Sequence, residues 1–363
     1  MQQYDLQSFV ILKLSRMVKR TLTALLFFLT GSLLSAQNAG TTTYNFLKLT
    51  NSARVAALGG SVIAIQDNDL NFVFHNPALL SEGMDQNINL NYIDYFAGVN
   101  YGYASYAFKE EGIGNFAAGI HYVDYGQFTR YDEYGVYQGT FRASEYALNL
   151  IGSRTIIDTF LTVGVNIKPV LSVFEQYTSF GIVMDLGAVY YNPHTLTTVG
   201  LVIRNFGTQI TTYAGEREKV PFEIQAGFSQ RLEHAPFRFS VILQQLQKWD
   251  LTYPEESDSD YSIDGQDIKT SKFDIIGDQL MRHVIFGAEF LPGKNFHVDL
   301  GYNYRRRQEL KADSRYGMVG FSWGFGFRVS KFHFAFGHAT YHLAGGTNHF
   351  SITTNLSDFY KKL

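Results

Sequence analysis

The sequence predicts an all-β protein, a 14-stranded antiparallel transmembrane β-barrel with an N-terminal plug-like segment. Three observations lead to this prediction. The 363-residue chain is rich in Gly, Tyr and Phe and holds only 7 Pro. Beyond Asn87 it alternates between apolar and polar side chains, which is the period of a strand with two unlike faces. Short and long connections alternate between the expected strands, as they do in membrane barrels.

The composition excludes several other classes of protein. With 45% hydrophobic residues the chain is too apolar to be disordered, and its net charge of -3 gives no bulk attraction for nucleic acid. It contains no Cys, which rules out disulfides, thiolate metal sites and cysteine nucleophiles. No HExxH, GxSxG or P-loop pattern occurs, and barrel curvature accounts for the glycines inside strands. We therefore expect no enzyme, no cofactor and no metal site.

The N-terminus has the features of a secretory signal peptide. Lys19 and Arg20 precede an apolar run over residues 22–34, which Ser35 and Ala36 follow. This run is well short of the roughly 20 apolar residues that a transmembrane helix needs. We therefore expect residues 1–36 to be a signal peptide that is cleaved after Ala36. Met17 could be the true start codon. Residues 1–16 therefore either belong to the signal peptide or are not translated.

The barrel proper is expected over residues 87–363. The strands are predicted at 87–97, 99–108, 114–124, 141–152, 159–170, 178–191, 195–206, 221–232, 236–246, 281–291, 295–306, 316–329, 332–341 and 347–356. In 295–306, for example, Phe296 and Leu300 share a face suited to lipid, whereas His297 and Asp299 share a face suited to water. A soluble β-sandwich is the alternative, but it seldom needs so many long strands.

The lengths of the connections predict how the barrel is oriented. The long ones are 125–140, 207–220, 247–280 and 307–315, and each follows an odd-numbered strand. Bacterial barrels have short periplasmic turns and longer external loops. We therefore expect an outer-membrane protein of a Gram-negative bacterium, surrounded by lipid, with both termini in the periplasm and the long loops extracellular.

The expected lumenal faces are predominantly polar and carry both signs of charge. The inward-pointing charged residues are Asp185, Glu223, Arg231, Arg238, Glu289, Asp299 and Arg305. Paired charges inside a barrel most often join neighbouring strands, so the sequence favours a structural role. A conducting pore or a ligand route stays open as the alternative.

Residues 37–86 precede the first strand and have a different pattern. Their run of small residues permits close backbone packing, and Gly59 and Gly60 permit positive φ. Asn76 and Pro77 form a turn signal. The segment therefore resembles a compact plug or an arm folded into the barrel.

The same segment carries a family resemblance. The motif residues are Ala57, Leu58, Gly59, Gly60, Asp67, Asp69, Asn76, Pro77 and Ala78. They resemble the start of fatty-acid-transporter-type outer-membrane barrels. The fuller string, from Thr43 to Leu80, is similar to the PorV/PorQ family of the type IX secretion system.

This resemblance implies an outer-membrane scaffold for the surface attachment machinery. Its expected partners are a PorZ-like surface protein and other type IX secretion components. The alternative is an outer-membrane transporter of hydrophobic small molecules, as in the broader group. A carrier of lipids needs an apolar pocket with a few polar groups, and the polar inward faces therefore favour the scaffold.

Aromatic residues in two expected external loops are the candidates for partner binding. They are Phe128, Tyr131, Tyr134, Tyr137, Trp249, Tyr253 and Tyr261. Aromatic side chains are enriched at the energetic centres of protein interfaces. Those nearest the strands could instead belong to the aromatic girdle at the membrane surface.

Overall fold

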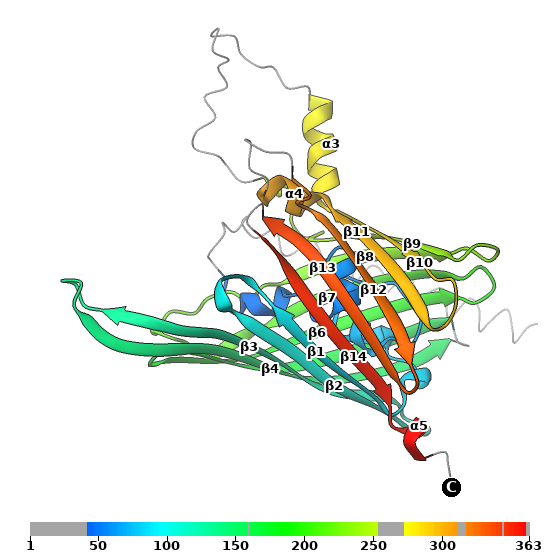
Figure 1. Ribbon diagram of the computed structural model, residues 1–363, viewed down its shortest axis with the longest axis horizontal. Helices are drawn as coiled ribbons and strands as arrows, with labels where there is room; N and C mark the ends of the chain where they lie inside the picture. The colour runs from blue at the N-terminus through cyan, green and yellow to red at the C-terminus, as the bar shows by residue number, and fades with distance from the viewer. Residues whose placement is uncertain (1–41, 158–159, 253–271, 311–316, 343–344, 361–363) are drawn as a thin grey trace, which may run out of the picture. The chain divides into compact units, whose positions relative to one another are not determined.

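The computed structural model describes residues 42–157, 160–252, 272–310, 317–342 and 345–360 (Figure 1). The predicted signal peptide, residues 1–36, lies outside the described residues, as do residues 37–41 of the predicted plug.

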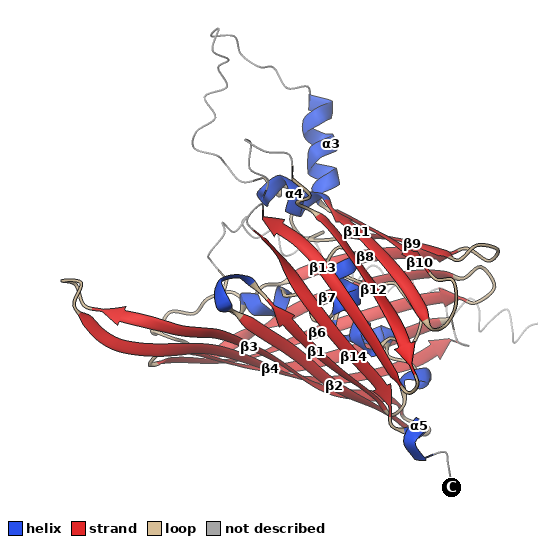
Figure 2. Cartoon of the chain, in the orientation of Figure 1, coloured by secondary structure: helices blue, strands red, loops and turns tan. Residues whose placement is uncertain are grey.

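The described residues form fourteen antiparallel strands that close into one barrel (Figures 1 and 2). Each strand pairs with its neighbours in sequence, and β1 closes the barrel on β14 through a ladder from Asn87↔Asn355 to Asp94↔Asn348. The strands are β1 Asn87–Asp94, β2 Asn100–Glu110, β3 Gly114–Tyr131, β4 Tyr137–Ile157, β5 Leu161–Phe174, β6 Tyr177–Asn192, β7 Thr197–Thr211, β8 Glu223–Arg231, β9 Phe237–Leu243, β10 Val284–Phe290, β11 Phe296–Asn303, β12 Phe321–Val329, β13 Phe332–His342 and β14 Gly345–Asn355. The predicted fold class is confirmed.

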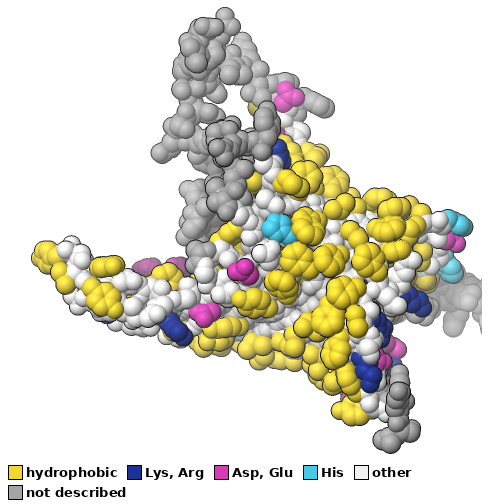
Figure 3. Space-filling view, in the orientation of Figure 1, with side chains coloured by type: hydrophobic (Ala, Val, Ile, Leu, Met, Phe, Trp, Pro, Cys, Tyr) yellow, Lys and Arg dark blue, Asp and Glu magenta, His cyan; other side chains and the backbone are white. Residues whose placement is uncertain are grey.

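The alternation of faces follows the prediction. Phe296 and Leu300 are 42% and 57% exposed on the outer face of β11, whereas Asp299 between them is fully buried. Figure 3 shows hydrophobic side chains gathered over the outer face of the strands that it displays. Within the described ranges, no helix is long and apolar enough to cross a membrane.

Residues 125–140 are not the loop that the sequence predicts. They form the end of the β3–β4 hairpin, because β3 continues to Tyr131 and β4 begins at Tyr137. The ladder of β2 with β3 ends at the pair Asn100↔Asp124, so the hairpin extends beyond the paired part of β2. Cross-strand packing explains the extension, since the rings of Phe128 and Phe141 stack with centroids 5.3 Å apart.

Two other expected loops contain helices. The connection from β9 to β10 contains α3, Lys272–Arg282, and its residues 253–271 lie outside the described part of the chain. The strand expected over 295–306 ends at Asn303, and α4, Tyr304–Leu310, follows. Arg305 therefore lies on a helix and not on a strand, and it forms an ion pair with Glu309 one helical turn away at 2.5 Å. Arg231, the last residue of β8, pairs with the inward-facing Arg238 of β9, as predicted, but it is exposed because it lies at the end of the strand.

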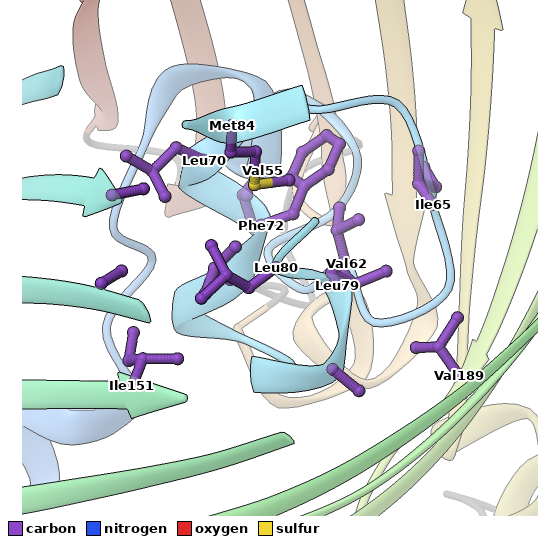
Figure 4. Packing of buried hydrophobic residues seen from close by; sticks show 14 of the residues in the cluster. Val55, Val62, Ile65, Leu70, Phe72, Leu79, Leu80, Met84, Ile151 and Val189 are labelled. Carbon is purple, nitrogen blue, oxygen red and sulfur yellow. The ribbon is translucent and has the colours of Figure 1, made fainter. Parts of the chain in front are cut away.

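Residues 42–86 lie inside the barrel. They contain the helix α2, Ala53–Ala57, and the 3₁₀ turns η1 Asn45–Lys48, η2 Leu70–Phe74, η3 Pro77–Leu79 and η4 Glu82–Met84. Two further short elements lie outside this segment, η5 Phe96–Gly98 and α5 Ser357–Tyr360. Figure 4 shows apolar side chains of the segment, among them Val55 and Phe72, packed together near Ile151 of β4 and Val189 of β6.

Candidate functional site

The candidate site is the contact between the N-terminal segment, residues 42–86, and the inner wall of the barrel. Its first part is built by the small residues of the family motif. Helix α2 ends where Gly59 and Gly60 take φ values of 97° and 102°, as the sequence predicts. Their amides donate to the carbonyls of Ala56 and Val55, which satisfies the end of the helix.

The second part of the motif caps two 3₁₀ turns. The Asp69 carboxylate accepts a hydrogen bond of 3.0 Å from the Asn71 amide at the start of η2. Asn76 accepts one of 3.0 Å from the Ala78 amide at the start of η3, and its own amide donates to the Ile63 carbonyl at 2.8 Å. Pro77 stands at the first position of η3, where a missing N–H leaves no bond unmade. The Asn-Pro-Ala string therefore begins η3 and joins it by a hydrogen bond to the backbone of Ile63.

A buried ion cluster joins the segment to β9 and β10. The Arg54 guanidinium lies 2.6 Å from Asp67, 3.1 Å from Asp69 and 2.6 Å from Glu289 of β10. Arg238 of β9 pairs with the same Asp67 at 2.7 Å and with Glu289 at 2.5 Å. Both arginines therefore bridge carboxylates of the segment and of the wall.

The opposite charges of the cluster favour the ionised forms of Arg54 and Asp67. Burial alone would raise the pKa of the Asp67 carboxyl, but the positive charges of Arg54 and Arg238 outweigh it and hold that pKa below its usual value. Burial likewise opposes the charged form of Arg54, and the carboxylates of Asp67 and Glu289 outweigh it, so its pKa is raised. Removing one member would leave its partners charged and buried.

Glycines of the wall allow the backbone of the segment to approach the sheet. Four cross-strand glycine pairs occur in the described strands: Gly164 with Gly187, Gly200 with Gly227, Gly287 with Gly301, and Gly324 with Gly337. At all of these except Gly287, an added Cβ would lie closer than 3.0 Å to an atom of the segment. The sequence analysis missed this role. Small residues that face each other across paired strands could have indicated where another backbone packs closely against the sheet.

Serines of the wall bind the backbone of the segment. Ser153, Ser229 and Ser322 donate hydrogen bonds of 2.7, 2.5 and 2.9 Å to the carbonyls of Leu80, Ala64 and Ala57. These carbonyls are thus satisfied by the wall. The backbone of the segment is therefore hydrogen-bonded directly to the inner wall of the barrel.

The lumenal face is polar, as predicted. Asp185, Glu223, Arg238, Glu289 and Asp299 are all buried. Sequence reasoning missed Lys168, which pairs with Asp185 at 2.7 Å and is itself buried. This pair joins the adjacent strands β5 and β6, and Arg238 with Glu289 joins β9 and β10.

The candidate partner-binding residues fall in two places. Phe128 and Tyr131 lie on β3, Tyr137 begins β4, and Tyr134 is 83% exposed in the turn between them. Trp249 follows β9 and is 58% exposed. Tyr253 and Tyr261 lie outside the described residues.

No protein-family model matches the sequence, and no curated protein matches it. Solved structures do. One is described as the TodX monoaromatic hydrocarbon channel deltaS2 mutant, which is 12% identical with a TM-score of 0.50, over 84% of this chain and 97% of that one. The toluene transporter TbuX of Ralstonia pickettii is 13% identical, with a TM-score of 0.48, over 85% and 99% of the two chains. A Pseudomonas aeruginosa FadL homologue is 10% identical, with a TM-score of 0.47, over 84% and 98%.

At such low identity the likeness concerns the fold. The TodX channel is similar to this chain in fold. The PorV/PorQ resemblance has no support among these findings and stays a prediction.

Proposed function

We propose that this protein is an outer-membrane scaffold component of the type IX secretion system that anchors a surface partner of the attachment complex. The observation that carries the proposal is the occupied lumen. Residues 42–86 contact the inner wall through a buried ion cluster and through backbone packed against glycines. A barrel closed in this way suits a rigid platform better than a conduit.

Opening the lumen would require several interactions to break together. Arg54 would separate from Glu289, and Arg238 would separate from Asp67. Both contacts are between buried charges, which are strongly disfavoured when they lose a partner. The segment would also lose the hydrogen bonds from the wall serines. These costs in free energy favour a segment that remains bound inside the barrel.

The proposed contact with the partner lies at the end of the barrel that carries the longer connections. The β3–β4 hairpin presents Tyr131, Tyr134 and Tyr137, all more than 60% exposed. Exposed aromatic side chains offer large contact areas to a protein such as a PorZ-like surface component. Trp249, and the loop that contains Tyr253 and Tyr261, form the second proposed contact region.

The proposal includes a division of the chain and a location. Residues 1–36 are the signal peptide, 37–86 the plug and 87–363 the outer-membrane barrel. Both termini are periplasmic and the longer connections extracellular. Short turns such as 330–331 and 291–295 at one end, with longer connections at the other, support this orientation.

The test is affinity purification from detergent-solubilised outer membranes, followed by mass spectrometry. The variant replaces Tyr131, Tyr134 and Tyr137 by Ala, and the control replaces Tyr190 and Tyr360, which are exposed near the other end, by Ala. We expect the wild type and the control to retain other secretion components and the hairpin variant to lose its surface partner. Heat-modified gel mobility would show that all three barrels are folded. Recovery of no such component with the wild type would contradict the scaffold.

A second candidate function is the passage of hydrophobic small molecules. It has support that the scaffold lacks, since one solved structure of similar fold is described as a monoaromatic hydrocarbon channel. The measurement is uptake of a monoaromatic hydrocarbon by cells that lack the protein and by cells that regain it. Uptake that depends on the protein, combined with no recovered secretion component, would establish the second candidate over the first.

A further inference from the structure

Helix α3 has two unlike stripes. Asp274, Asp278 and Arg282 follow one another at intervals of four residues, so they lie on one face. Ile276 and Leu280 are also four residues apart and lie two residues away from the charged stripe, which places them on the opposite face. The helix is therefore amphipathic.

Asp278, at the centre of the charged stripe, contacts the neighbouring helix α4. Asp278 accepts a hydrogen bond of 2.7 Å from the Tyr304 hydroxyl of α4 and another of 2.7 Å from the Arg282 guanidinium. Ile276 and Leu280 are 55% and 51% exposed. A surface helix of a water-soluble protein has the reverse arrangement, with its apolar stripe toward the core.

We propose that the Ile276–Leu280 face of α3 contacts the surrounding lipid at the external rim of the barrel, where the headgroups meet the acyl chains. This inference rests on the proposed insertion of the barrel into the outer membrane. It assigns the role of a membrane-contacting helix to α3, which stands at the end of the barrel between β9 and β10 in the chain.

Continuity with the apolar outer face of the barrel identifies lipid as the occupant. Only His283 separates α3 from β10, whose Phe286 is 41% exposed on the outer face. On the neighbouring strand β9, Phe239 is 49% exposed, and Leu246 beyond that strand is 43% exposed. Exposed apolar side chains therefore occur on both strands and on α3, which one residue separates from β10.

Trp249 gives the level of the membrane boundary. Trp is enriched where the apolar core of a membrane meets water. Trp249 is 58% exposed, and its ring lies 5.9 Å from the ring of His283, the residue that follows α3. His283 also contacts the Trp249 carbonyl through Nε2 at 3.1 Å. The end of α3 therefore lies at the same level as this tryptophan.

The residues that precede α3 in the sequence are a poor alternative cover for this face. Residues 254–271 contain six acidic residues and only three large apolar ones: Tyr261, Ile263 and Ile268. Such a segment gains little by burying an apolar helix face and would have to desolvate its own carboxylates.

The experiment uses single cysteines, since the chain has none of its own. Ile276→Cys and Leu280→Cys probe the apolar face, Asp274→Cys is the matched control on the charged face, and Leu300→Cys reports insertion of the barrel. Each full-length protein is labelled with an environment-sensitive fluorophore and reconstituted into phosphatidylcholine vesicles that contain lipids with spin labels on their acyl chains. We expect blue-shifted emission and loss of most of the intensity at 276, 280 and 300, and neither effect at 274.

The outcomes distinguish failure of the proposed role of α3 from failure of the proposed membrane insertion. If position 300 is quenched but positions 276 and 280 behave like 274, the role of α3 is wrong and the membrane barrel stands. If position 300 is not quenched either, membrane insertion itself fails. A variant that also lacks residues 254–270 should keep the quenching at 276, and its loss would show that the loop, not lipid, creates the apolar environment.

Discussion

Replacement of Arg54 by Met should loosen the N-terminal segment from the wall of the barrel. The change removes the ion pairs of Arg54 with Asp67, Asp69 and Glu289 and leaves Arg238 as the remaining cation among three carboxylates. Removal of one partner from a buried pair costs about 3–5 kcal/mol. Because each 1.36 kcal/mol is a factor of ten, the open population of the segment should rise by roughly two to three and a half orders of magnitude.

Thiol labelling measures this opening directly. Val73 lies in η2, is fully buried, and would supply the only thiol of the chain as Val73→Cys. We expect a maleimide to react with this cysteine faster by about the same factor in the Arg54→Met background, because only open molecules are labelled. Adding Glu289→Gln should recover part of the protection, since it removes one of the uncompensated negative charges. Equal labelling rates with and without Arg54 would refute the reasoning that the ion cluster holds the segment against the wall of the barrel.

Four further predictions concern pH, lipid contact, backbone packing and processing. Since the fold lowers the pKa of Asp67, its contribution to stability is present above the usual value of 3.8 and is lost as the pH falls below it; the unfolding free energy should decline there, and Asp67→Asn should weaken the decline. Leu300→Arg should destabilise the lipid-inserted barrel by about 2–4 kcal/mol, whereas Leu300→Met should be nearly neutral in the same urea titration. Gly301→Ala should cost about 1–3 kcal/mol because its Cβ would meet the backbone of the segment, whereas Gly152→Ala, whose nearest contact is 3.5 Å away, should be tolerated; similar unfolding midpoints for both would argue against close packing. N-terminal sequencing of the mature protein should begin immediately after Ala36, and a chain that still contains Arg20 would rule out that cleavage.

The local pattern of the sequence was sufficient for the barrel. A strand has a period of two, and each wall residue faces either lipid or the lumen, so an outward Leu300 beside an inward Asp299 is readable without any tertiary information. The count of fourteen strands follows from the same alternation and is confirmed. The conformation of Gly59 and Gly60 was predictable as well, since positive φ is a property of single residues.

The ends of the strands were less predictable because neighbouring elements determine them. Tyr304 and Arg305 continue the alternation of β11, but helix α4 begins there and Arg305 pairs with Glu309 one turn later. Residues 125–140 contain Gly and charged residues typical of a loop, yet pairing of Phe128 with Phe141 extends the hairpin. In both places, contacts made after folding outweigh the local pattern.

The interior of the barrel was decided by the tertiary structure. Arg54, Asp67, Glu289 and Arg238 come from parts of the chain separated by up to 235 residues, and no spacing in the sequence relates them. The glycine pairs of the wall are explained only when the backbone of residues 42–86 lies against them. The physical reason is that strand periodicity is a local property, whereas ion pairing and close backbone approach depend on which distant surfaces the closed barrel brings together.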